Sequence, residues 1–103
     1  MLYDVRIEVE EVRGHCAAGY REGDFFILRG FYIERKDCVR ICLHALTAMA
    51  TLLSPFSHGV PADQLGIGEG DIGRVQCPDP GPPLTCGGTV VFRLTRLKRE
   101  SKS

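Results

Sequence analysis

The chain has 103 residues, of which 44% are hydrophobic, and its 13 basic and 13 acidic side chains give a formal net charge of zero. This length is typical of one domain with a single core, so we expect residues 1–103 to form one domain. A zero net charge argues against the basic surface that a nucleic-acid-binding protein needs. No apolar run approaches the roughly 20 residues of a membrane-spanning helix. We therefore expect neither a nucleic-acid nor a membrane partner.

The cysteine content indicates a reducing compartment. Five cysteines are present, a fraction of about 5%, which is below that of secreted disulfide-rich domains. An odd number also prevents complete pairing within the chain. Residues 1–8 alternate between apolar and charged side chains, unlike a signal peptide. We therefore predict a cytoplasmic protein whose thiols are free or bound to metal.

Alternating apolar and charged side chains predict a half-buried strand at residues 2–9. A second strand is predicted at 25–28, and residues 31–33 are expected to extend it past a bulge at Gly30. Two further strands are predicted at 72–77 and 89–95, the latter rich in β-branched residues.

One helix is predicted between these strand pairs, over residues 38–53, with Asp37 as its N-cap. Pro55 is expected to end it, because a proline disfavours helical geometry in the residue before it. Apolar residues recur at three- and four-residue spacing on one side of this helix: Cys42, Leu43, Leu46, Met49, Ala50 and Leu53.

The remaining segments are expected to be irregular. Residues 54–73 are rich in glycine and are predicted to form a long mobile loop. Residues 96–103 are expected to be a basic C-terminal tail. The order ββαββ predicts an α+β fold with a single helix packed on a largely antiparallel sheet.

Three separated cysteines are candidate metal ligands: Cys16, Cys42 and Cys77. Their thiolates suit zinc, iron or an iron–sulfur cluster, and His15 or Asp79 would complete the coordination. The spacing differs from that of a zinc ribbon, which has two Cys-x-x-Cys motifs. Cysteine is also among the most frequently buried residue types, so inert, packed thiols without any cofactor remain an alternative.

His15, Cys16 and Asp79 are also candidate catalytic residues. In this second hypothesis the protein is a metal-free enzyme, for example of a biosynthetic pathway. One of the three side chains would move protons on a small organic molecule, and the loop at 54–73 would close over it. We would then expect a homo-oligomer, because one helix covers only one face of the sheet.

The other histidines and cysteines are expected to lie outside the thiolate site. His44 is two positions from Cys42, about 200° around a helix, so we favour His15 over His44. Cys38 falls at the predicted helix start and Cys86 in a glycine-containing turn. His58 falls in the predicted loop, where it could form part of a lid.

The sequence resembles a family of small cysteine-containing proteins found mainly in bacteria and archaea. The resemblance covers nearly the whole chain and rests on Gly14-His-Cys16, Gly23-Asp24, Cys42 and Val75-Gln-Cys77-Pro-Asp-Pro80. It implies a compact α+β domain with three recurrent cysteines, and it implies no particular activity. The chain departs from the family at Tyr20, where a histidine is frequent, which weakens the case for a histidine-rich metal site.

Overall fold

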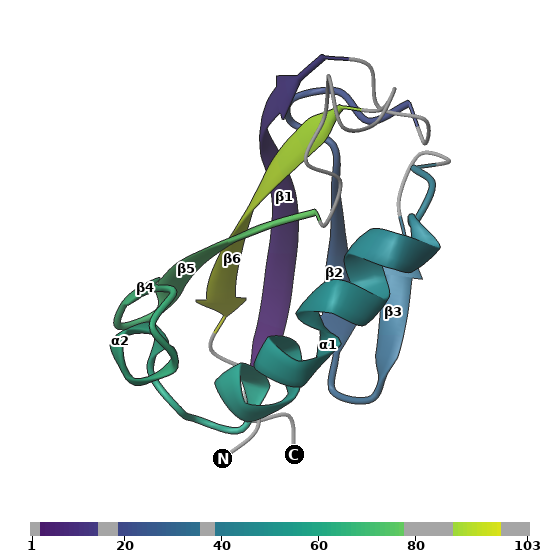
Figure 1. Cartoon of the computed structure of the whole chain (residues 1–103). Helices are drawn as coiled ribbons and strands as arrows, with labels where there is room; N and C mark the ends of the chain where they lie inside the picture. The colour runs from purple at the N-terminus through teal and green to yellow at the C-terminus, as the bar shows by residue number, and fades with distance from the viewer. Residues whose placement is uncertain (1–2, 15–18, 36–38, 78–87, 98–103) are drawn as a thin grey trace.

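Six strands and two helices account for most of the residues that the computed structural model describes, which are 3–14, 19–35, 39–77 and 88–97. The strands form one antiparallel sheet, and the long helix crosses one of its faces (Figure 1). The elements in chain order are β1 (Asp4–Arg13), β2 (Phe25–Arg29), β3 (Tyr32–Arg35), α1 (Leu43–Ser57), α2 (Ala62–Leu65), β4 (Gly68–Glu69), β5 (Ile72–Gln76) and β6 (Thr89–Leu97).

The strand order in the sheet is β3-β2-β1-β6-β5-β4. The long strands β1 and β6 pair along the centre, from Asp4 opposite Leu97 to Arg13 opposite Thr89, with a register shift between Val9 and Glu11. The end of β1 and the start of β6 therefore lie at the same end of the sheet. The α+β class and the antiparallel sheet agree with the prediction, but the sheet has more strands than the order ββαββ implies.

The additional strands, β3 and β4, are each joined to a neighbouring strand by a tight turn. Gly30 and Phe31 form a two-residue turn between β2 and β3, so the chain reverses there instead of continuing past a bulge. Gly70 and Asp71 form the corresponding turn between β4 and β5. The φ angles of Gly30 and Gly70 are 67° and 57°. Such hairpin turns require a positive φ at this position, and glycine adopts it without steric cost.

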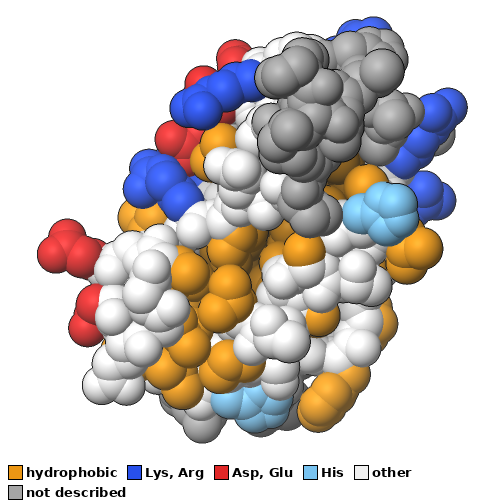
Figure 2. All heavy atoms as spheres, viewed as in Figure 1, with side chains coloured by type: hydrophobic (Ala, Val, Ile, Leu, Met, Phe, Trp, Pro, Cys, Tyr) orange, Lys and Arg blue, Asp and Glu red, His pale blue; other side chains and the backbone are white. Residues whose placement is uncertain are grey.

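The core lies between α1 and the inward-facing side chains of the sheet. The predicted alternation in the first strand is confirmed, because Val5, Ile7 and Val9 are buried. The other fully buried large apolar residues come from β2, α1 and β6: Phe26, Phe56, Val90, Phe92 and Leu94. Figure 2 shows hydrophobic side chains at the surface between α1 and the α2–β4–β5 region, so α1 covers this face of the sheet only in part.

The helix begins and ends later than predicted. Residues 39–42 are not helical, and Cys42, with an extended backbone, is the N-cap of α1; the predicted N-cap Asp37 lies outside the described residues. Pro55 lies within the last turn instead of ending the helix. Phe56 and Ser57 are almost completely buried. Packing of this turn against the sheet outweighs the backbone hydrogen bond that proline cannot donate.

The segment predicted as one irregular loop, 54–73, contains the last turn of α1, the short helix α2 and strand β4. Its backbone is tied into the sheet, because the Arg74 amide donates to the Ile67 carbonyl and the Ala62 amide to the Gly70 carbonyl. The predicted tail also begins later, since β6 extends to Leu97 and includes Arg96.

Gly68→Ala is expected to destabilise this region. A Cβ atom at position 68 would overlap the carbonyl oxygen of Ile72 on the neighbouring strand. Because backbone must move to accommodate it, we expect the free energy of unfolding to fall by about 1–3 kcal/mol. Gly70→Ala is the matched control, since a Cβ there meets no atom within 4 Å and is disfavoured only by the positive φ. Urea denaturation checks both variants, and a larger loss in the control would contradict the steric argument.

The opposite face of the sheet carries charged pairs, and none of the described elements covers it. Arg29 bonds to Glu34 at 2.9 Å and to Asp4 at 3.0 Å, and these carboxylates raise the pKa of Arg29. At the end of β1, Arg13 holds the pKa of Glu11 below its ordinary value by hydrogen bonding. The exposed pair of Glu11 and Arg13 contributes little to stability, whereas Asp4, the partner of Arg29, is buried. Among the described residues, no helix is long and apolar enough to cross a membrane.

Candidate metal centre

Two of the predicted site residues belong to the described part of the chain. Cys42 and Cys77 are both half-buried, unpaired thiols that pack against the hydrophobic core. The predicted residues His15, Cys16 and Asp79 lie outside the described residues. The local chemistry of the two described thiols is therefore the starting point for the site.

Cys77 directly follows β5 and is hydrogen-bonded to the start of β6. Its backbone amide donates to the Val90 carbonyl at 2.9 Å. In return, the Val90 amide donates to the Cys77 Sγ at 3.2 Å, and the thiol donates to the Gly88 carbonyl oxygen at 3.7 Å. The backbone of residues 88–90 therefore holds the sulfur in place at the end of β5, and the thiolate is the form of cysteine that binds metals.

Cys42 occupies the N-cap position of α1. Its carbonyl oxygen accepts from the Leu46 amide at 2.9 Å, which begins the helix. No side chain caps this helix end, and no acidic residue lies in its first turn. Cys42 thus lies just before the helix instead of within it, and its side chain still packs against the core.

Tyr20 connects the surroundings of the two thiols. Its hydroxyl oxygen accepts a hydrogen bond from the Cys42 amide at 2.8 Å. Its buried ring meets Phe92 edge-on, with 5.5 Å between ring centroids. Phe92 lies two residues after Val90 on the same side of β6, and Val90 donates to the sulfur of Cys77. Tyr20 thus links the backbone of Cys42 to β6, the strand that also bonds to the Cys77 sulfur.

The end of β1 lies next to the start of β6. Arg13 pairs with Thr89, the residue before the hydrogen-bond donor to the Cys77 sulfur. The chain continues from Gly14 through four residues that include His15 and Cys16, and the description resumes at Gly19, next to Tyr20. Figure 1 shows the end of β1 at the top of the molecule and the start of α1 lower down, on the right.

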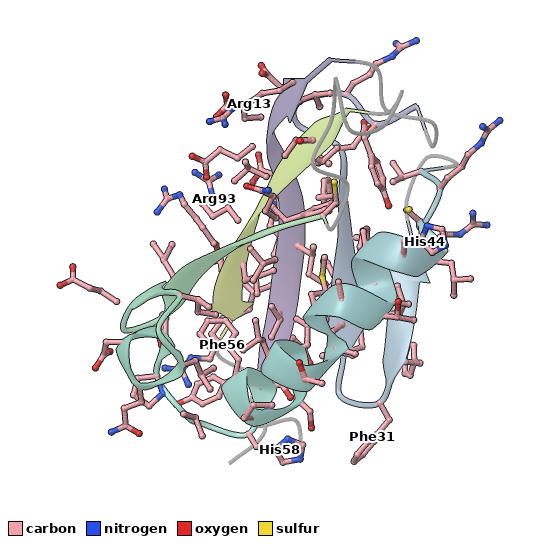
Figure 3. The ribbon with its side chains drawn as sticks, viewed as in Figure 1. Arg13, Phe31, His44, Phe56, His58 and Arg93 are labelled. Carbon is pink, nitrogen blue, oxygen red and sulfur yellow. The ribbon has the colours of Figure 1, made fainter. Side chains whose placement is uncertain are left out.

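The described residues alone do not form a metal site. Among them, no group of three or more histidine, cysteine, aspartate or glutamate side chains is arranged to hold a metal ion. His44 is exposed and lies near the start of α1 (Figure 3). The importance of position 20 was visible in the sequence only as a departure from the family pattern, and its contact with Cys42 was not predicted.

A second feature that the sequence analysis missed is an apolar groove between α1 and the β2–β3 hairpin. Its volume is about 370 Å³. Its lining consists of Leu28, Gly30, Phe31, Ile33, Leu46, Ala50, Leu53, Ser54, Ser57 and His58. The groove shares no residue with the thiolate region. No single sequence motif marks it, because its two walls come from segments about 20 residues apart.

Comparison of the chain with protein-family models, curated proteins and solved structures finds no match. The resemblance to a family of small cysteine-containing proteins therefore stays an expectation from the sequence. The case for a function rests on the residues and contacts described above.

Proposed function

We propose that this protein binds zinc, iron or an iron–sulfur cluster through the thiolates of Cys16, Cys42 and Cys77. The hydrogen bond from the Val90 amide to the Cys77 sulfur is the observation that carries the proposal. The N-cap position of Cys42 and the hydrogen bond from its amide to Tyr20 support it. Thiolates select zinc and iron over magnesium and calcium.

His15 or Asp79 would supply the fourth ligand in this proposal. His15 is adjacent to Cys16 in the sequence, and Asp79 lies two residues after Cys77. Four protein ligands make a closed zinc site, which contributes directly to the stability of the fold. A site with only the three thiolates would leave a position open for a substrate or water molecule.

Metal analysis of protein purified without oxygen tests the proposal. We expect near-stoichiometric zinc or iron, together with an ultraviolet–visible spectrum that distinguishes zinc from iron–sulfur absorption. Three of the five thiols should resist a thiol reagent until a chelator removes the metal. Metal-free protein whose thiols react only after unfolding would overturn the proposal and indicate that the cysteines only pack in the core.

Cys77→Ser and Cys42→Ser are each expected to lower metal affinity by more than about 100-fold. Even the loss of a residue that only hydrogen-bonds to a metal ligand lowers affinity by about 10–100-fold. Cys38→Ser and Cys86→Ser are matched controls outside the proposed ligand set and should retain the metal. Competition with a chromophoric chelator measures affinity, and circular dichroism shows whether each variant is folded. Folded Cys42→Ser and Cys77→Ser variants with unchanged metal affinity would contradict the assignment.

A further inference from the structure

The two edges of the sheet are protected to different degrees. At one edge, β4 has only two residues, and α2 packs against it. At the other edge, no described strand pairs with the outer side of β3 (Figure 1). β3 contains no proline, and its two charged residues, Glu34 and Arg35, have opposite signs. An edge strand with these properties is able to pair with a strand of another chain.

The pairing of β3 with β2 determines which of its backbone groups point outward. Hydrogen-bonded and non-hydrogen-bonded pairs alternate along an antiparallel ladder. Arg29 and Tyr32 flank the two-residue turn, and the residues at this position of such a hairpin form a hydrogen-bonded pair. The amide and carbonyl groups of Ile33 and Arg35 therefore point away from β2. An extended strand presents amides and carbonyls at the spacing that matches these groups.

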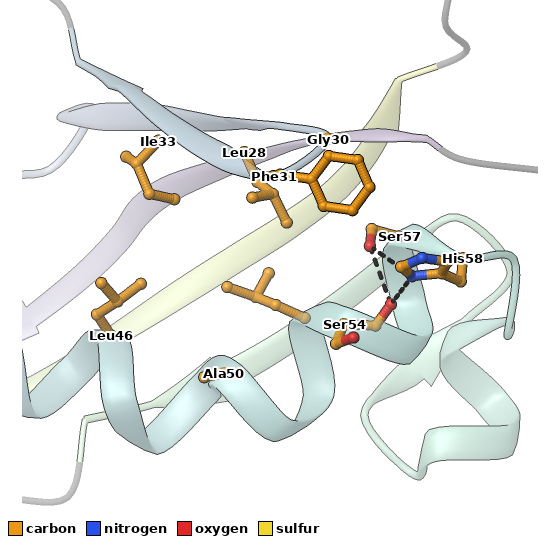
Figure 4. Close-up of a pocket in the computed structure, with 10 residues that line it drawn as sticks. Leu28, Gly30, Phe31, Ile33, Leu46, Ala50, Ser54, Ser57 and His58 are labelled. Atoms are coloured by element: carbon orange, nitrogen blue, oxygen red, sulfur yellow. Dashed lines mark hydrogen bonds between the residues drawn. The ribbon is translucent and has the colours of Figure 1, made fainter.

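Two exposed aromatic side chains lie beside the same edge. Phe31, in the turn before β3, is 87% exposed, and Tyr32 is 63% exposed. Figure 4 shows Phe31 and Ile33 on the side of the hairpin that faces α1. Tyr32 and Glu34 lie on the opposite side, because successive side chains of a strand alternate between its faces. The edge thus combines outward-pointing backbone groups with exposed apolar surface.

We propose that β3 pairs antiparallel with β3 of a second copy of this chain, so that the two sheets join into one. A two-fold axis at Glu34 would place two glutamates opposite each other, and an axis at Arg35 would do the same with two arginines. Like charges in this position are destabilising. An axis at Tyr32 would pair β3 with the turn. An axis at Ile33 avoids all three, and Ile33 then exchanges two hydrogen bonds with Ile33 of the second copy.

This register is complementary on both sides of the joined sheet. On the side that faces α1, Arg35 of the second copy lies next to Phe31, where a guanidinium is attracted to the face of the exposed ring. On the other side, Tyr32 lies opposite Glu34 of the second copy. Arg29 already pairs with Glu34 at 2.9 Å, so the Tyr32 ring meets no unpaired charge. One chain supplies both halves of each contact, which favours a second copy over an unrelated strand.

Sedimentation over a range of protein concentrations tests the dimer, and amide hydrogen exchange locates it. We expect a reversible dimer in which the Ile33 amide is protected from exchange, because pairing gives it a carbonyl acceptor. A wild type that stays monomeric would overturn the proposal, and so would a dimer whose Ile33 amide exchanges as fast as an exposed one. β3 contains no proposed metal ligand, so either failure would leave the metal proposal intact.

Charge changes in β3 test the register. Tyr32→Glu would place a glutamate opposite Glu34 of the second copy at two symmetric positions. We therefore expect the dissociation constant of the dimer to rise at least about tenfold. Adding Glu34→Lys to this variant would place opposite charges at both positions and should restore the dimer.

Ile72→Glu is the matched control. Ile72 is also an exposed apolar residue, but it lies in β5, next to the other edge of the sheet. We expect this variant to dimerise like the wild type, and circular dichroism shows whether each variant is folded. A folded Tyr32→Glu variant with an unchanged dissociation constant, or a double variant that stays dissociated, would overturn the proposed pairing. Loss of the dimer in Ile72→Glu would place the interface elsewhere and overturn it as well.

Discussion

Arg96→Ala is expected to lower the free energy of unfolding by about 2–4 kcal/mol, because it removes a buried side chain together with the hydrogen bonds that its guanidinium donates. Only 6% of the Arg96 side chain is exposed. Its Nη1 atom donates to the carbonyl oxygens of Phe56 and Val60, and its Nη2 atom donates to that of Gly70. The change would remove one donor from each of these carbonyl groups, although the Gly70 carbonyl keeps the Ala62 amide and the Phe56 carbonyl keeps the Gly59 amide.

The same guanidinium also packs between two aromatic rings and binds a carboxylate. Its carbon lies 4.6 Å from the ring centroid of Tyr3 and 4.8 Å from that of Phe56. Its Nε donates to Asp71 at 3.0 Å. Arg96 thus connects β6, the end of α1 and the β4–β5 turn. Lysine presents a compact point charge instead of a planar fork, so Arg96→Lys should recover only part of the loss.

Chemical denaturation of Arg96→Ala beside Arg74→Ala measures this effect. Arg74 of β5 pairs with Glu10 of β1 at 2.9 Å, across the intervening strand β6, but both side chains are substantially exposed. We expect Arg74→Ala to cost less than about 1 kcal/mol. A domain of this size has roughly 5–15 kcal/mol of stability, so the two variants should be easy to distinguish. Losses of similar size would show that the buried network contributes no more than a surface ion pair.

Segments with period-two alternation, as at 2–9, or with a run of apolar or β-branched residues, as at 25–28 and 89–95, were predictable as strands from the sequence. The predicted strands at 2–9, 25–28, 72–77 and 89–95 correspond to β1, β2, β5 and β6. Alternation succeeds here because one face of the sheet is buried and the other carries charge. β1 extends beyond the predicted strand to Arg13 because β6 continues to pair with it after the register shift. That extension depends on a distant strand.

Boundaries that depend on tertiary packing were predicted less well. Pro55 is a strong local signal for a helix end, but burial of Phe56 and Ser57 against the sheet keeps the last turn helical. The strands β3 and β4 have only four and two residues, too few to show a period. Glycine at 30 and 70 was compatible with a bulge or a loop, and the positive φ that makes each a hairpin turn is visible only in the structure.

In the candidate site, too, residue identities were predictable from the sequence, but features that depend on tertiary structure were not. Cysteine identity and separation were enough to select Cys42 and Cys77 as candidates. The hydrogen bond from the Val90 amide to the Cys77 sulfur depends on the register between β5 and β6. The N-cap position of Cys42 depends on where α1 begins. Neither feature has a local sequence signal. Tyr20 acquires its role because β6 places Phe92 beneath it.

Phe92→Ala is expected to destabilise both the fold and the proposed metal site. The Phe92 side chain is fully buried in the central strand β6. Replacing it with alanine is expected to lower the free energy of unfolding by about 3–5 kcal/mol, the usual cost of a large-to-small change in a core. The ring also supports Tyr20, whose hydroxyl accepts the amide hydrogen bond of Cys42. We therefore expect thiol protection to fall together with stability.

Val91→Ala separates this effect from general weakening of β6. Val91 neighbours Phe92 but faces the opposite side of the sheet, where it is only half-buried. Its replacement should cost about 1 kcal/mol or less, because little apolar surface is lost. Urea denaturation measures stability, and the rate of thiol modification under native conditions measures protection of the cysteines. If Phe92→Ala unfolded more readily but its thiols stayed as protected as in Val91→Ala, the contact through Tyr20 would have no part in holding the site.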